Sequence, residues 1–173
     1  SHGHMGKNVW YEESIHIPLY IRQKGRLAPA KYSELVASPD HMPTLLGLLD
    51  IPVPDTCQGF NHAPGILGQE SNAPKDAFLC SYPGMPEMVA AFEKQGLNSK
   101  CYGWRGIRTH THTFVINNGY KPGEKQVKML YNNEKDPYQQ NPLMITELNE
   151  ELAADYEKRL REYLDMQQDP FLM

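Results

Sequence analysis

The sequence predicts an α+β fold, in which a roughly four-stranded antiparallel sheet is packed by a long C-terminal amphipathic helix. Short runs of β-branched and aromatic residues recur between residues 77 and 131, and turn residues separate them. Such runs are typical of antiparallel strands. Beyond them, apolar residues recur at spacings of three and four from Ile145 to Leu164, which is the pattern of a helix with one buried face.

The strands are placed by their composition and by the residues that bound them. We expect strands at 77–82, 102–108, 111–116 and 125–131, with a short helix at 87–95 between the first two. Lys75-Asp76 and Pro83-Gly84 bound the first strand. The third is predicted to end at Asn117-Asn118-Gly119, because these residues favour turns.

In the N-terminal half, the sequence predicts a strand, a short helix and a loop. Ile15, Ile17, Leu19 and Ile21 alternate with other residues, which predicts a half-buried strand. A short, well-buried helix is expected at 41–50, since Ser38-Pro39-Asp40 favours a helix start and two prolines follow the helix. Residues 58–75 are rich in glycine and proline, and we expect a loop there with one helical turn near 63–67.

Length, charge and cysteine usage limit the possible classes. The 173 residues suffice for one domain or one large subdomain. A net charge of −4 argues against nucleic acid as a partner. No stretch approaches the roughly 18 apolar residues of a membrane span, so we expect no membrane partner. Three widely spaced cysteines support neither a disulfide framework nor a zinc site.

A histidine and a lysine lie close together on a glycine-rich segment at the start of the chain. Ser1-His2-Gly3 is followed by Lys7, so an imidazole and an ammonium could both donate to an anionic group. An alternative interpretation is that Ser1 to Met5 is the remnant of an expression tag. The residues alone leave both interpretations open.

Six blocks of sequence, taken in order, resemble the C-terminal part of a type I sulfatase of the alkaline phosphatase superfamily. They are Ser1-His2-Gly3 to Lys7, Tyr11-Glu12-Glu13-Ser14 to Arg22, Asp40 to Leu46, Val53 to Gly59, Arg105 to Thr109, and Leu130 to Asn141. The resemblance implies that residues 1–75 end a catalytic domain and that 76–173 form a C-terminal subdomain. The predicted N-terminal strand and helix would then belong to the larger sheet of an α/β alkaline-phosphatase-like fold.

The same resemblance implies an activity for a longer parent protein. The parent would hydrolyse a sulfate ester of a carbohydrate or aryl alcohol, using formylglycine as nucleophile together with calcium. The chain has no C-x-P-x-R motif, and the family's calcium ligands lie upstream of Ser1. We therefore expect this fragment to bind neither cofactor and to be inactive alone. Its expected partners are the N-terminal part of the parent and a sulfated small molecule or glycan, and the resemblance implies a periplasmic or secreted parent.

Two residues are assigned catalytic roles by resemblance. Lys7 matches the family lysine that contacts the sulfate group, and His2 matches a histidine found in many members on the same loop. A fixed ammonium beside a sulfuryl oxygen would stabilise the charge that develops as the ester oxygen departs.

Four residues of the C-terminal sheet are candidates for choosing the substrate. In the family this sheet borders the substrate cleft, so Trp104, Arg105, His110 and His112 are predicted substrate-binding residues. His110 and His112 flank Thr111 and would share one face of a strand. No third ligand is visible, so no metal site is predicted, and the alternative for both histidines is an ordinary exposed position.

Two other functions remain open at this point. One is a phosphoesterase or phosphonate hydrolase of the same superfamily. The other is a non-catalytic module that binds sulfated glycans or mediates assembly.

Overall fold

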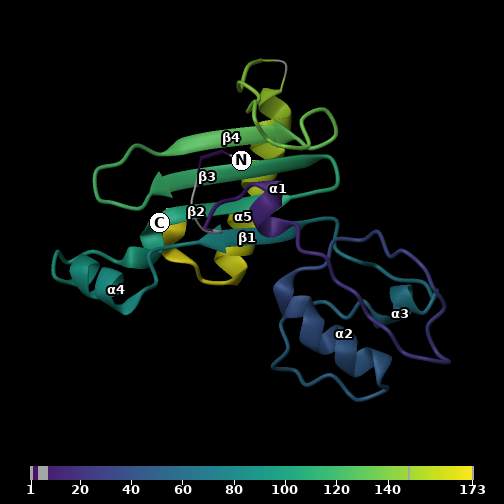
Figure 1. Cartoon of the computed structure of the whole chain (residues 1–173). Coiled ribbons are helices and arrows are strands. Elements are labelled where there is room, and N and C mark those ends of the chain that lie inside the picture. Colours follow the sequence, from purple (N-terminus) through teal and green to yellow (C-terminus); the bar gives the residue numbers. More distant parts are fainter. Residues whose placement is uncertain (1, 4–7, 148, 173) are drawn as a thin grey trace. The chain divides into compact units, whose positions relative to one another are not determined.

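The protein is described by a computed structural model covering residues 2–3, 8–147 and 149–172 (Figure 1). The chain divides into two compact units. The sheet unit comprises Ser1–Ile17 and Phe78–Met173, and the insert unit comprises Pro18–Ala77. The first 17 residues thus belong to the same unit as the C-terminal half. The assignment of residues 1–75 to a catalytic domain stays a prediction.

The sheet unit contains the predicted four-stranded sheet. Its strands are β1 (Ala77–Ser81), β2 (Gly103–Arg108), β3 (His112–Gly119) and β4 (Val127–Asn132), and they lie in the order β1-β2-β3-β4. The pairs β2–β3 and β3–β4 are antiparallel, with Phe114 opposite both Ile107 and Leu130. A helix α4 (Pro86–Glu93) and a 3-10 turn η2 (Ser99–Cys101) connect β1 to β2. The predicted sheet and the helix at 87–95 are confirmed.

Alternate residues of the strands build two separate cores, because successive side chains of a strand point to opposite faces. Phe114 and Leu130 pack with helix α5 (Glu150–Met166) in one core. Val115 and Tyr131 pack with Trp10 in the other. Figure 1 shows α5 behind the sheet and helix α1 (Glu12–Ile15) in front of it. The N-terminal segment therefore covers the face that α5 leaves open.

Helix α5 confirms the amphipathic pattern but begins later than predicted. Its buried side chains lie three or four residues apart: Ala153, Tyr156, Leu160 and Leu164. Asn149 precedes the helix and bonds locally, accepting from the backbone N of Thr146 and donating to the carbonyl of Met144. These bonds favour a turn over a helix in this segment. After α5, the 3-10 turn η3 (Pro170–Leu172) ends the described chain.

The turn predicted at Asn117-Asn118-Gly119 is wrong, because β3 continues to Gly119. Asn117 pairs with Trp104 on one side and Val127 on the other. The side chain of Asn118 donates to the carbonyls of Cys101 and Phe171. Asn118, a residue that favours turns, is thus held in the strand by side-chain bonds to neighbouring segments.

The strand predicted over residues 15–21 is also wrong. Helix α1 ends at Ile15, and no strand is assigned between residues 8 and 76. Ile17, Leu19 and Tyr20 are exposed. A strand needs a neighbouring strand to pair its backbone, and this segment has none within that stretch.

The insert unit is built around α2 (His41–Leu48), preceded by the 3-10 turn η1 (Ser38–Asp40) and followed by α3 (Ala63–Ile66). Both predicted helices are confirmed. The prediction that α2 is well buried holds only in part, because its residues Pro43, Thr44 and Leu48 are buried whereas Met42 and Leu45 are exposed. Across the described ranges of the chain, no helix is long and apolar enough to cross a membrane.

Candidate functional site

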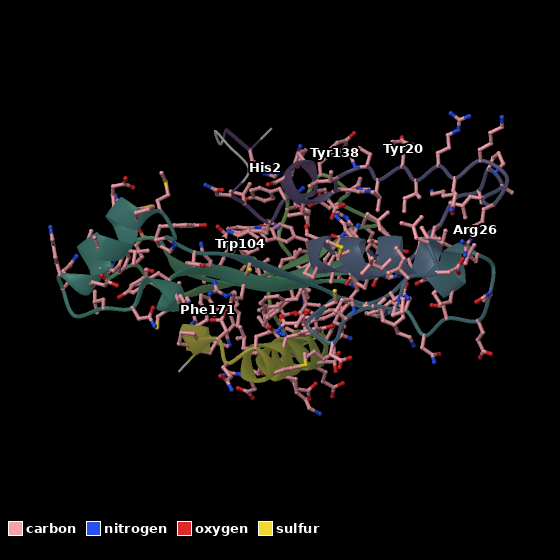
Figure 2. The ribbon with its side chains drawn as sticks, turned by 90° about the horizontal axis from the view of Figure 1, so that it is seen from below. His2, Tyr20, Arg26, Trp104, Tyr138 and Phe171 are labelled. Carbon is pink, nitrogen blue, oxygen red and sulfur yellow. The ribbon has the colours of Figure 1, made fainter. Side chains whose placement is uncertain are left out.

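His2 is held at a defined position in the sheet unit. Its Nε2 lies 2.8 Å from the backbone oxygen of Tyr138. Its ring stacks on that of Tyr11, with the centroids 3.6 Å apart and the planes 4° from parallel. Figure 2 shows His2 beside Tyr138, on the opposite side of the sheet from Phe171. Lys7, the other predicted catalytic residue, lies outside the described residues.

The loop that contacts His2 is folded by two short polar side chains. The Oδ1 of Asn132 accepts from the backbone N of Glu134 and Lys135. The carboxylate of Asp136 accepts from the backbone N of Gln140 at 3.1 Å and of Asn141 at 2.7 Å. Asparagine and aspartate favour such turns because their side chains replace backbone acceptors. These bonds set the path of residues 133–141, which we call the clamp loop.

Gln139 connects the clamp loop to the N-terminal segment. Its side chain is buried, its φ is 51°, and its Oε1 accepts from the backbone N of Glu12 at 2.8 Å. Its Nε2 donates to the Oδ1 of Asn133 at 3.4 Å. No individual sequence pattern predicts this contact, although Glu12 and Gln139 lie in two of the six blocks that carry the family resemblance.

Glu12 also binds the sheet directly. Both of its carboxylate oxygens accept from Arg108 at the end of β2, at 2.9 Å from Nε and 3.0 Å from the terminal nitrogen Nη2. Such a two-point contact fixes orientation as well as distance. Helix α1 is therefore attached to the sheet through Arg108 and to the clamp loop through Gln139.

Trp104 and Arg105 are both buried in the sheet unit. The Nε1 of Trp104 donates to the carbonyl of Asn8 at 2.9 Å, and its ring meets that of Trp10 edge-on at 5.6 Å. Trp104 thus supports the segment that follows Lys7. Direct contact of Trp104 with a substrate stays a prediction.

The guanidinium of Arg105 is surrounded by protein acceptors. Its Nε and one terminal nitrogen bind the carboxylate of Asp169 at 2.8 and 3.2 Å. Three backbone carbonyls accept its remaining donors: those of Ser81, Trp104 and Lys100. The aromatic ring of Phe171 lies 4.7 Å from its Cζ. Arg105 therefore attaches the chain beyond α5 to the sheet, and its substrate role stays a prediction.

The predicted strand face shared by His110 and His112 is wrong, because β2 ends at Arg108 and β3 begins at His112. His110 lies in the connection. The Nε2 of His112 lies 3.3 Å from the amide nitrogen of Asn132, and its Nδ1 lies 2.9 Å from the Oγ1 of Thr111. Burial lowers the pKa of His112, although the charge of Glu134 acts in the opposite direction.

A second polar cluster, missed at the sequence level, lies in the insert unit. The fully buried ring of His62 lies 3.2 Å from the carboxylate of Asp40 through Nε2, and 3.0 Å from the hydroxyl of Tyr32 through Nδ1. The same carboxylate accepts from the backbone N of Ala37 and Phe60. Since all these partners are protein groups from separate segments, the cluster joins the loops of the insert unit around α2.

Comparison with known families identifies the chain. A sequence model of the N-sulphoglucosamine sulphohydrolase C-terminal family matches residues 1–168. The chain belongs to this family. The matched range includes residues 1–5, which does not favour the interpretation of those residues as a tag remnant. The predicted resemblance to the C-terminal part of a sulfatase is confirmed.

The relatives of this chain are much longer proteins. An endo-4-O-sulfatase of Bacteroides thetaiotaomicron is 29% identical over 168 residues, which are 95% of this chain and 32% of that protein. An ulvan-active sulfatase of Formosa agariphila is 28% identical over 172 residues, which are 92% of this chain and 29% of that protein. The chain thus spans about a third of the length of these relatives.

Solved structures show the same fold. A Bacteroides thetaiotaomicron structure, described with the metabolism of multiple glycosaminoglycans, superposes with a TM-score of 0.68 at 27% identity over 86% of this chain and 30% of its own. A phosphonate monoester hydrolase of Agrobacterium radiobacter superposes with a TM-score of 0.56 at 23% identity over 77% of this chain and 25% of its own. The latter likeness shows the fold alone.

The described residues of this family member do not fit the cofactors that the resemblance implies. Calcium takes about six to eight oxygen ligands, whereas no three His, Cys, Asp or Glu side chains within 2–3, 8–147 and 149–172 form a group able to hold a metal. The three cysteines are free, and none lies in a C-x-P-x-R motif. We therefore assign no ligand or nucleophile to these residues.

His112 should give the sheet unit a pH-dependent stability. Because its pKa is lowered on folding from the ordinary 6.5, the unfolded chain binds more protons near pH 6. Stability is expected to fall as the pH drops through 6.5 to the folded-state pKa, and then to level off. In His112→Gln this part of the pH dependence should disappear. The change in unfolding free energy that it removes is less than about 1 kcal/mol, because the ring is partly exposed.

The measurement is urea unfolding at about pH 7.5 and about pH 5.5, on either side of the ordinary histidine pKa. Tryptophan fluorescence reports on the sheet unit, since both tryptophans, Trp10 and Trp104, are buried there. His41→Gln, an exposed histidine of the insert unit, is the matched control. Equal slopes in His112→Gln and the wild type would contradict the prediction.

Proposed function

We propose that this chain is the C-terminal part of a sulfatase whose full-length form hydrolyses a sulfate ester of a carbohydrate or aryl alcohol. The match of residues 1–168 to a sulphohydrolase C-terminal family carries the proposal. Its support is that both relatives described above are named sulfatases and that this chain spans about a third of each.

In this proposal, Lys7 and His2 contact the sulfate group. The ammonium of Lys7 would stabilise negative charge on the sulfuryl oxygens, and His2 would donate to the sulfate or to the leaving oxygen. His110, in the connection between β2 and β3, and His112, at the start of β3, would help to select the substrate. Trp104 and Arg105 would help to select the substrate by supporting the site from within the sheet, because both are buried.

The nucleophile and the metal would come from the N-terminal part of the parent. By the family resemblance, formylglycine would supply the attacking group and calcium would bind the sulfate, and residues of that part would hold both. Support for such a partner comes from apolar side chains that this chain leaves exposed, namely Ile17, Leu19 and Tyr20 after α1 and Met42, Leu45 and Leu49 on or beside α2. Covering them would remove apolar surface from water. A periplasmic or secreted location belongs to the same proposal.

The test compares the full-length protein with the 173-residue chain on 4-nitrophenyl sulfate and on sulfated disaccharides. The full-length protein should hydrolyse them, and the chain alone should not. Lys7→Ala in the full-length protein should lower kcat/KM by about a hundredfold, as the loss of one charge-stabilising donor does. Lys24→Ala, a change at an exposed lysine, should leave kcat/KM unchanged.

The alternatives give different results in the same assay. Turnover of phosphonate or phosphate esters in preference to sulfates would favour a phosphonate hydrolase or phosphoesterase, whose fold this chain shares. Binding of sulfated glycans by the chain alone, lost in His110→Ala, would favour a non-catalytic module. Sulfate release by the chain alone would contradict the assignment of the nucleophile to another part of the protein.

A further inference from the structure

We propose that the clamp loop, residues 133–141, positions His2 and determines which ring nitrogen His2 offers to the sulfate group. The proposal rests on the proposed function, because it concerns the histidine that would contact the sulfate. It assigns Gln139 as a positioning residue, acting through Glu12 and Tyr138 without touching the substrate.

Two consecutive residues of the clamp loop hold the N-terminal segment at two points. The carbonyl of Tyr138 meets the ring of His2, and the side chain of Gln139 meets the backbone N of Glu12. These contacts span 136 and 127 residues of sequence. Since the carboxylate of Glu12 is also fixed by Arg108, the segment from His2 to Glu12 is held at both of its ends.

The conformation of Gln139 indicates that the loop is shaped for this contact. A φ of 51° is uncommon for a residue other than glycine. The residue is also almost completely buried, and a buried amide is costly unless it is hydrogen-bonded. The Gln139 amide is hydrogen-bonded at both ends, because its oxygen accepts from Glu12 and its nitrogen donates to Asn133. The side chain of the preceding residue, Tyr138, is instead exposed.

The acceptor at His2 fixes the tautomer. A backbone carbonyl can only accept a hydrogen bond, so the Nε2 of His2 must carry the proton that it donates to Tyr138. Stacking on Tyr11 fixes the plane of the ring. The carboxylate of Glu13 lies 3.9 Å from the same Nε2. Among the described residues, no hydrogen-bond partner is assigned to Nδ1, so this edge is the one proposed for the ligand. Because sulfate oxygens can only accept, Nδ1 would donate to them with the ring protonated on both nitrogens.

The experiment observes the imidazole of His2 directly, by ¹⁵N NMR of the 173-residue chain. We expect the wild type to show a protonated Nε2 whose proton exchanges slowly with water. In Gln139→Gly, which accepts the positive φ but lacks the amide, this exchange should be about tenfold faster, as loss of the two amide hydrogen bonds implies. Gln140→Gly adds a glycine to the same loop at an exposed residue and should exchange like the wild type.

A role in folding alone would give another result. The proposal is overturned if His2 in the wild type carries its proton on Nδ1, if its exchange equals that of the exposed His16, or if Gln139→Gly matches Gln140→Gly. If Gln139→Gly fails to fold, Gln139→Asn replaces it, since asparagine tolerates positive φ but is too short to reach Glu12. These outcomes need no substrate, so they are independent of whether the full-length protein hydrolyses sulfates.

Discussion

Replacing Arg105 with alanine is expected to lower the free energy of unfolding of the sheet unit by about 3–5 kcal/mol. Only 1% of its surface is exposed, and it bonds to Asp169 and to three backbone carbonyls. The variant would leave the partly buried carboxylate of Asp169 without its cation, and would remove the hydrogen bonds that Arg105 donates to three backbone carbonyls. Leaving such groups unsatisfied costs far more than the net value of the pair.

Urea unfolding followed by tryptophan fluorescence measures this effect in the sheet unit. Arg161→Ala is the matched control, because Arg161 is half exposed and binds Glu157 one helical turn away; its change should stay below about 0.5 kcal/mol. The double variant Arg105→Ala, Asp169→Ala should be destabilised by less than the sum of the effects of the two single variants, because each single variant already removes the same Arg105–Asp169 interaction. Equal effects of Arg105→Ala and Arg161→Ala would contradict the structural role of Arg105.

Replacing Leu160 with alanine should destabilise the same unit by about 2–5 kcal/mol. Leu160 has no exposed surface and packs with Ile107, Phe114 and Leu130 of the sheet. Truncation removes buried apolar atoms and leaves a cavity between α5 and the sheet, because the strands cannot close on it.

Leu152→Ala provides the matched control for this prediction. It is the same change in the same helix, at a residue that is 36% exposed. Its effect should be less than half that of Leu160→Ala in the same urea experiment. If the two variants were equally destabilised, α5 would not bury the face that contains Leu160 and Leu164.

The elements that sequence predicts well are those whose signals are local. Spacing of apolar residues identifies α5, and bounded apolar runs identify the four strands, because a helix or strand buries one regular face. Helix α2 is likewise predicted by its start and stop residues. The exposure of Met42 and Leu45 is not predicted, because the sequence shows which residues are apolar but does not show what covers them.

The predictions that failed depend on distant partners. Ile17 and Leu19 have the alternation of a strand, but alternation cannot supply the neighbouring strand that the backbone requires. The burial of Arg105 is not predicted either, because its partner Asp169 lies 64 residues later in the sequence. The contact between Gln139 and Glu12 is invisible for the same reason.

The sheet unit is formed by residues from both ends of the chain, and this arrangement has a consequence during synthesis. His2 leaves the ribosome 136 residues before Tyr138, a delay on the order of 10 s at common elongation rates. During that time its ring lacks the carbonyl that holds it, and α5 does not yet exist. A chain interrupted before the clamp loop would contain His2 without its positioned ring, so this histidine, although synthesised first, can be set in place only after all four strands have been made.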